Sequence, residues 1–270
     1  MNGPRRVGPH QLAVYDHPAE TTSTDTATRT PRVVFVHGSM DRAAAFLKVV
    51  RRLPELDRVR YDRRGYGRSA TARVADSLAE QVADLLSVVD GERSVLIGHS
   101  LGGVIALATA ERRPELVAAL GVFEAPMGWA PWWPDNSAGR DAMAALSGSG
   151  PEDAAEVFMR RMIGDDRWEQ LPPSTRAARR AEGPALVGEI RALRDDGAPY
   201  VADRVAVPAV VARGSRAAPH HVRASDELAS SVSGAELVII DGAGHGAPTS
   251  HPDDFAAFVR RAVARGMIPA

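Results

Sequence analysis

The sequence predicts a doubly wound α/β fold with a mainly parallel sheet and an inserted helical cap, and three observations support this prediction. Short apolar runs of strand-forming residues alternate with helical patterns over most of the chain. The alternation stops between Met127 and Val205, where Arg, Ala, Glu and Met dominate. A Gly-His-Ser-Leu-Gly segment at residues 98–102 stands between an apolar run and a helical pattern.

The alternating part supplies the sheet and the helices that cover it. Strands are expected at residues 11–15, 33–36, 58–62, 95–97, 120–123, 207–212 and 237–240. Helices are expected at residues 43–52, 75–89, 101–112, 220–231 and 252–265. Because each parallel pair needs a right-handed crossover, helices cover both faces, and ligands bind beyond the carboxyl ends of the strands. The polar, low-complexity residues 21–28 are expected to form a mobile loop.

The interruption of the pattern predicts the domain organisation. We expect residues 1–126 and 203–270 to form the α/β core, and residues 127–202 to form the cap. Pro and Gly clusters divide the cap into about three short helices. The cap holds all four tryptophans; each alone is best explained by packing, but as a group they suggest an apolar roof over the substrate. The expected pocket residues are Met40, Trp129, Trp132, Trp133, Phe158 and Met162.

The composition limits the class of partner. With 270 residues, 44% of them hydrophobic, the chain can bury one large core. A net charge of -1 gives no support for binding nucleic acid or an anionic membrane, so we expect a small-molecule substrate. Cysteine is absent, which excludes disulfides, thiolate metal sites and a cysteine nucleophile, and no metal or other cofactor is expected. No apolar run approaches the ~20 residues of a membrane span, and residues 1–10 lack the apolar core of a signal peptide, so we expect a cytoplasmic protein.

The glycines around Ser100 predict a nucleophile. A Gly-Ser-Gly cluster alone is also typical of a flexible turn, but here an apolar run precedes it and a helical pattern follows it. In such a strand–turn–helix, a side chain at position 98 or 102 would collide with neighbouring backbone. A serine hydroxyl is a weak nucleophile at neutral pH, so it needs a base and a third group that orients the base.

His245 is the best candidate for the base. It stands in a loop of small residues, Asp241 to Gly246, directly after the last expected strand. His99 is expected to point away from the nucleophile, and His37 to brace a turn at the end of a strand. The remaining histidines of the second half fall in or beside helices, without a carboxylate or further histidine at metal-ligand spacing: His220, His221 and His251.

Two further motifs complete a resemblance to a known family. Residues 36–39 read Val-His-Gly-Ser after an early strand, and residues 62–69 read Asp-Arg-Arg-Gly-Tyr-Gly-Arg-Ser after the next one. With the Ser100 segment and His245, the sequence resembles the α/β-hydrolase family over most of the chain outside the cap. The resemblance implies an α/β-hydrolase fold. It also implies that the backbone N–H groups of Ser39 and Leu101 form an oxyanion hole, which stabilises the tetrahedral intermediate.

The sequence departs from the common family pattern at the acid. After the strand at 207–212 the family pattern G-x-x-D is replaced by Gly-Ser-Arg-Ala at 214–217, and Ala217 cannot orient an imidazole. A second family arrangement, seen in some haloalkane dehalogenases, takes a glutamate from the end of the preceding strand. Glu124 ends that strand, 24 residues after Ser100, which fits one helix and one strand. We therefore expect Glu124 to be the acid, with Asp226 and Asp241 as alternatives.

The identity of the nucleophile selects the reaction. Ser100 removes the family branches that use an aspartate, namely dehalogenases and epoxide hydrolases. The sequence thus favours a serine hydrolase of the carboxylesterase or lactonase type, acting on an ester, lactone or thioester bond of a small, partly apolar molecule. A tryptophan-rich cap that excludes water would favour non-hydrolytic acyl transfer, cyclisation or lyase chemistry on a biosynthetic intermediate. Ala217 alone favours a ligand-binding protein on a hydrolase fold.

Overall fold

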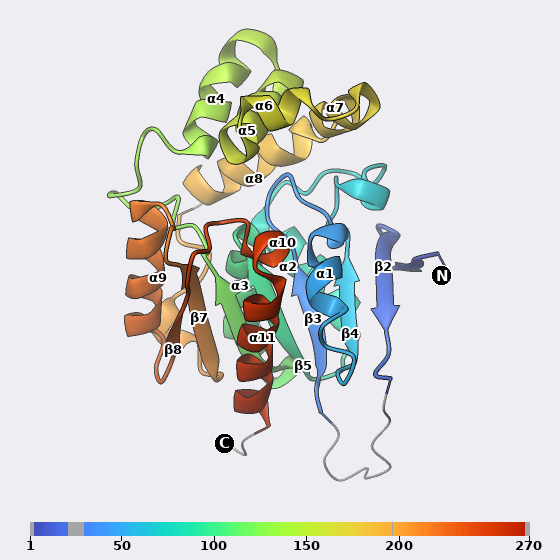
Figure 1. Ribbon diagram of the computed structural model, residues 1–270, viewed down its shortest axis with the longest axis vertical. Helices are drawn as coiled ribbons and strands as arrows, with labels where there is room; N and C mark the ends of the chain where they lie inside the picture. Colours follow the sequence, from blue (N-terminus) through green and yellow to red (C-terminus); the bar gives the residue numbers. More distant parts are fainter. Residues whose placement is uncertain (1–2, 21–29, 196, 268–270) are drawn as a thin grey trace.

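The computed structural model describes residues 3–20, 30–195 and 197–267, and its core is an eight-stranded sheet (Figure 1). The expected loop at 21–28 lies outside the described residues. The strands are β1 (Arg5–Val7), β2 (Leu12–His17), β3 (Arg32–Val36), β4 (Arg58–Tyr61), β5 (Ser94–His99), β6 (Val117–Phe123), β7 (Ala209–Gly214) and β8 (Glu236–Ile240). They are ordered β1-β2-β4-β3-β5-β6-β7-β8. Strands β3 to β8 pair in parallel and β2 joins β4 antiparallel, so the predicted fold class is confirmed.

Helices cover both faces of this sheet. One face carries α1 (Leu47–Val50), α10 (Ala247–Ser250) and α11 (Pro252–Gly266); α1 and α11 lie in front of the sheet in Figure 1. The other face carries α2 (Leu78–Val89), α3 (Leu101–Arg112) and α9 (Pro219–Ser231). Alternate residues of β3 face the helices on opposite sides of the sheet. Val34 and Val36 pack toward α2 and α3, whereas Val33 and Phe35 pack toward α1 and α11. Strand β3 is therefore buried on both sides, as expected for an apolar run in a parallel sheet.

The boundaries of several elements differ from the expected ones. The helix expected at 43–52 is a 3₁₀ turn, η2 (Ala43–Phe46), followed by the single turn α1. Helix α2 begins at Leu78 rather than residue 75 because Ser77 caps it, its Oγ accepting the N–H of Glu80 over 3.3 Å. Strand β1 was not expected, since three residues with two arginines carry no apolar run. The described residues also form the 3₁₀ turns η3 (Gly67–Ser69), η4 (Pro114–Leu116) and η5 (Ala202–Arg204).

A second layer of helices lies over the carboxyl ends of the strands (Figure 1). We call it the helical layer; it consists of α4 (Ala138–Ser149), α5 (Pro151–Ile163), α6 (Asp165–Glu169), α7 (Pro173–Arg180) and α8 (Gly183–Asp195). The prediction of about three helices in this stretch is wrong. A helix break that was not expected lies at Gly164, between α5 and α6. Its φ of 86° is a left-handed conformation that glycine adopts without strain.

The helical layer has its own apolar cluster, which includes residues of the sheet's loops. Trp168 is 1% exposed and belongs to this cluster with Met159 and Leu186. Met40 and Tyr66, from loops at the carboxyl ends of β3 and β4, join the same cluster. The layer is thus packed onto the edge of the sheet where ligands bind in such folds.

Within the described ranges, every helix is too short or too polar to cross a membrane.

Candidate active site

Ser100 occupies a sharp turn between β5 and α3. Its backbone has φ 53° and ψ -126°, a conformation that non-glycine residues rarely adopt. A Cβ on Gly98 would lie 2.4 Å from the carbonyl oxygen of Gly102, and one on Gly102 would lie 2.0 Å from that of Val36. Both positions therefore require glycine, which confirms the steric prediction made for this segment.

The parallel pairing of β5 and β6 brings Ser100 and Glu124 side by side. His99 pairs with Phe123 at the ends of these strands, and the N–H of Ser100 donates to the carbonyl oxygen of Phe123 over 2.9 Å. Glu124 follows with a φ of 46°, and its own N–H bonds to Ala212 of β7 over 3.0 Å. The two strand ends thus point both side chains toward the same edge of the sheet.

Glu124 contacts the imidazole of His245. Its Oε2 lies 2.7 Å from His245 Nδ1, and its Oε1 accepts the N–H of Gly214 over 2.9 Å. The carboxylate is fully buried, so both of its oxygens are bonded where water cannot reach them. Glycine is needed at 214 because a Cβ there would lie 2.1 Å from the carbonyl oxygen of Ala243, in the loop that carries His245.

The two alternative acids have other partners. Asp226 Oδ1 accepts from Arg213 Nε over 3.1 Å, and Asp241 Oδ1 accepts from Ser215 Oγ over 3.0 Å. Both aspartates are exposed. Of the three carboxylates weighed from the sequence, Glu124 is the one whose hydrogen bond reaches the histidine.

A cavity of about 420 Å³ opens above Ser100. His245, Ser39 and Leu101 line it together with the serine, so the structure brings these four predicted residues to one pocket. Trp133, Phe158 and Met162 of the expected roof also line the cavity.

The other three expected pocket residues occupy different surroundings. Met40 is buried in the cluster of the helical layer. Trp129 packs edge-on against Tyr200 with ring centroids 5.6 Å apart, and the guanidinium of Arg223 covers Trp132 at 4.3 Å. Packing thus accounts for these three side chains, and periodicity alone could not separate them from the residues that line the cavity.

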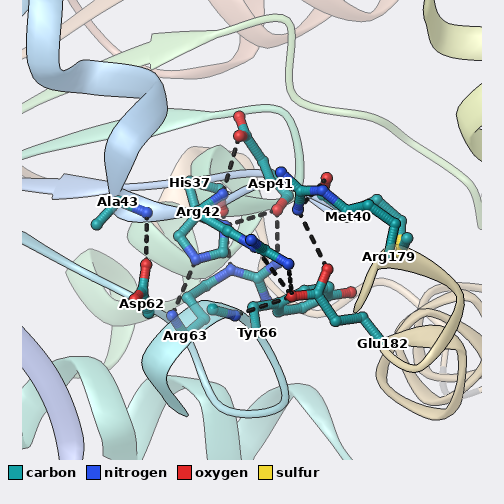
Figure 2. A network of polar contacts seen from close by, with 12 residues as sticks. His37, Met40, Asp41, Arg42, Ala43, Asp62, Arg63, Tyr66, Arg179 and Glu182 are labelled. Carbon is teal, nitrogen blue, oxygen red and sulfur yellow. Dashed lines mark hydrogen bonds and ion pairs between the residues drawn. The ribbon is translucent and has the colours of Figure 1, made fainter. Parts of the chain in front are cut away.

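The loop that carries Ser39 is held by His37 and Arg63, both labelled in Figure 2. His37 Nε2 accepts the backbone N–H of Arg63 over 2.9 Å, so the ring proton is on Nδ1, which donates to the carbonyl oxygen of Gly38 over 2.8 Å. The guanidinium of Arg63 donates to the carbonyl oxygens of His37 and Gly38 over 2.9 and 2.8 Å. The expected bracing role of His37 is confirmed.

Ion pairs tie the same loop to the helical layer. Arg42 and Arg179 both pair with the buried Glu182, at 2.7 and 3.1 Å. Figure 2 shows the two guanidinium groups directed toward this carboxylate. Glu182 also accepts the N–H of Gly67 over 2.9 Å, and Arg179 donates to the carbonyl oxygen of Met40 over 3.3 Å. The position of the helical layer is therefore coupled to the loops that border Ser100.

His221 is a site residue that the sequence did not reveal. Its ring stacks on that of His245, with centroids 4.6 Å apart and planes 24° apart, and it lines the cavity. Potential ligand atoms of Glu124, His221 and His245 lie within 4.8 Å of one another, a group that sequence spacing could not find because its members lie on three separate segments. The hydrogen bond between Glu124 and His245 already explains the proximity of two of them.

Three histidines around the site favour the neutral form. Burial, and secondly the neighbouring His245, lower the pKa of His99 to about 3. Burial likewise lowers the pKa values of His37 and His221 well below the ordinary value. His99 Nε2–H donates to the carbonyl oxygen of His245 over 2.8 Å, and His99 is not among the residues that line the cavity.

These lowered pKa values predict that the protein is less stable in mild acid. Below about pH 6.5 the unfolded chain binds protons at these histidines and the folded chain does not, so stability falls as the pH drops toward the folded-state pKa values. Each such histidine contributes up to about 1.4 kcal/mol per pH unit. Urea unfolding followed from pH 7.5 to pH 5 should show this decline, with a shallower slope for His99→Gln. The same slope in both proteins would contradict the assignment of His99.

Comparison with known proteins places the chain in a family. The family profile described as "Alpha/beta hydrolase family" matches residues 33–258. The chain is similar to lipase LipV of Mycobacterium tuberculosis, with 28% identity over 252 residues, 85% of this chain and 92% of that protein.

Solved structures show the same fold. The enol-lactonase from Burkholderia xenovorans superposes with a TM-score of 0.72 at 20% identity, covering 94% of this chain and 96% of that one. A thermophilic esterase from Thermogutta terrifontis gives a TM-score of 0.71 at 18% identity, covering 99% of each chain. With the family profile spanning most of the chain, the resemblance drawn from its motifs is confirmed: the chain belongs to the alpha/beta hydrolase family.

Proposed function

We propose that this protein is a serine hydrolase that cleaves an ester, lactone or thioester bond in a small, partly apolar molecule. The observation that carries the proposal is the shared position of Ser100 and His245 in one cavity, with Glu124 bonded to the far side of the imidazole. A lipase, an enol-lactonase and an esterase stand among the similar proteins, which agrees with this class.

In the proposed mechanism Ser100 attacks the carbonyl carbon and His245 takes its proton. Glu124 Oε2 accepts the proton on Nδ1, which leaves Nε2 as the basic nitrogen that faces the cavity. Since Gly214 holds the other carboxylate oxygen, the acid keeps one orientation throughout the cycle. His245 then protonates the leaving group, and water hydrolyses the acyl-enzyme with the same base.

The negative oxygen of the tetrahedral intermediate would be stabilised by the N–H groups of Ser39 and Leu101. Both residues line the cavity beside Ser100. Leu101 is the first residue of α3, so its N–H belongs to a helix terminus that carries partial positive charge. Removal of one such donor typically lowers kcat by about 10²–10³-fold.

The domain organisation expected from the sequence fits this function. We assign residues 1–126 and 203–270 to the catalytic core and residues 127–202 to the cap. Trp133, Phe158 and Met162 come from this cap and line the cavity, so the cap supplies the apolar contacts for a partly apolar acyl group.

Labelling of Ser100 tests the proposal. A fluorophosphonate probe should modify the wild-type protein at Ser100, whereas Ser100→Ala should lose the label and at least about 10³-fold of the hydrolysis of a simple aryl ester. Ser225→Ala, which changes a buried serine of α9, is the control and should keep both properties. Labelling or hydrolysis that survives in Ser100→Ala would rule out the proposed nucleophile.

A further inference from the structure

Arginines from four separate elements line the cavity above Ser100. Arg140 lies on α4, Arg161 on α5, Arg194 on α8 and Arg216 in the loop after β7. None of the described residues that line the cavity is acidic. A small-molecule pocket with this lining presents guanidinium groups and apolar surface, but no carboxylate, to whatever it binds.

The carboxylate partners of three of these arginines are absent from the cavity lining. Arg140 lies 3.5 Å from Asp135 and Arg161 lies 3.6 Å from Asp141, while Arg194 pairs with its neighbour in sequence, Asp195, at 2.7 Å. The three carboxylates are 94%, 38% and 51% exposed, and ion pairs at such exposed positions are weak.

Arg216 contacts no carboxylate among the described residues. Burial lowers the pKa values of His220 and His221 in the same lining, which favours their neutral forms, so these two histidines add little charge of their own. The lining therefore gives the cavity a positive potential next to the nucleophile.

A guanidinium matches a carboxylate because its planar fork of N–H donors can bond both oxygens. The same lining also contains four apolar side chains: Phe158, Met162, Ile190 and Leu193. This combination fits an acyl group with an apolar middle and an anionic end.

Resting on the proposed hydrolase function, we propose that the substrate is an ester or lactone whose acyl portion ends in a carboxylate, and that the four cavity arginines bind this group. The apolar side chains then contact the methylene segment, and the reacting carbonyl reaches Ser100.

Three matched aryl esters test this preference. The p-nitrophenyl monoester of glutaric acid carries a carboxylate, p-nitrophenyl methyl glutarate carries a neutral ester in its place, and p-nitrophenyl pentanoate ends in a methyl group. We expect kcat/KM for the anionic ester to exceed that for the neutral ones by at least about tenfold. The advantage should shrink with added salt, which screens the charges. It should also shrink in Arg161→Gln and Arg216→Gln, but not in Arg260→Gln, an exposed arginine of α11 outside the cavity.

A binding measurement keeps the test independent of turnover. Monomethyl glutarate should raise the melting temperature of the Ser100→Ala variant more than dimethyl glutarate does, and Arg216→Gln should reduce that shift. Hydrolysis of all three esters at equal kcat/KM, or equal thermal shifts, would overturn the carboxylate preference and leave the hydrolase function standing. Absence of both fluorophosphonate labelling and ester hydrolysis would instead overturn the proposed function, and the thermal shifts would still decide the ligand class.

A different observation concerns a buried chain of contacts that runs from α8 to the peptide beside Ser100. Glu189 Oε1 accepts from Arg63 Nη1 over 2.5 Å, and the two side chains are 3% and 0% exposed. Tyr66 donates its hydroxyl to the other oxygen of Glu189 over 2.8 Å. Arg63 Nη2 then donates to the carbonyl oxygen of Gly38 over 2.8 Å.

The carbonyl of Gly38 and the N–H of Ser39 belong to one planar peptide group. In a trans peptide these two groups point in opposite directions, and the described part of the chain contains no cis peptide bond. Fixing the carbonyl with two donors, Arg63 and His37, therefore fixes the direction of the Ser39 N–H. This peptide passes close to the nucleophile: a Cβ on Gly38 would lie 2.9 Å from Ser100 Cβ.

The geometry points to Glu189 and Arg63 as positioning residues for the oxyanion-stabilising N–H of Ser39. Like the carboxylate preference, this role rests on the proposed function. Since Glu189 lies on α8, the helical layer takes part in orienting the groups that stabilise the transition state.

A neighbouring ion pair provides the matched control. Arg64 bonds Asp84 through two hydrogen bonds of 2.8 and 2.7 Å and is equally buried, but it lies on the α2 side of the same turn. Both Glu189→Gln and Asp84→Asn remove a carboxylate from a buried arginine and should lower stability. We expect only Glu189→Gln to lower kcat, by about tenfold or more, with little change in KM. A trifluoromethyl ketone forms an adduct with serine that mimics the tetrahedral intermediate, and only Glu189→Gln should weaken its binding.

If Glu189→Gln fails to fold, Tyr66→Phe is the alternative, because it removes one contact of Glu189 with a smaller loss of stability. It should likewise weaken ketone binding with little change in KM. Equal changes in the Glu189 and Asp84 variants, or a ketone affinity that follows KM, would overturn the positioning role. A wild-type protein that the fluorophosphonate does not label would instead argue against the proposed function itself.

Discussion

The parallel register between β5 and β6 is the constraint on which the rest of the site depends. Because His99 lies opposite Phe123, the residues that follow them, Ser100 and Glu124, leave the sheet side by side. Both then adopt positive φ values, which turn their side chains toward the cavity edge. A shift of one residue in this pairing would move every side chain of the strand to the opposite face of the sheet and would separate Ser100 from Glu124.

A second set of buried charges joins the helical layer to this edge. Glu182 and Glu189 each bind arginines of the sheet's loops, and both carboxylates are nearly inaccessible to water. Breaking such a buried pair leaves an unpaired charge, which typically costs 3–5 kcal/mol. The layer is therefore fixed over the cavity by specific contacts as well as by apolar packing around Trp168.

The sequence predicted the features that depend on local chemistry. The turn at Ser100 could be predicted from glycines at positions where a Cβ would collide with backbone. Glu124, which bonds the imidazole of His245, could be predicted because it directly follows an apolar strand. Two features could not be predicted because they depend on how distant segments pack: the stacking of His221 on His245, and the fact that Trp133 lines the cavity whereas Trp132 does not. The extra break at Gly164 was missed because a lone glycine within a helical pattern is a weak signal.

The central claim is that Glu124 orients His245 for Ser100, and kinetics of Glu124→Gln tests it most directly. Glutamine would keep the bond from Gly214 but present N–H to His245 Nδ1, which forces the imidazole proton onto the nitrogen that must accept from Ser100. We predict a fall in kcat of about 10²–10⁴-fold with the fold retained, while Asp226→Asn and Asp241→Asn stay close to wild type. An unchanged rate in Glu124→Gln, or a comparable loss in either aspartate variant, would contradict the account.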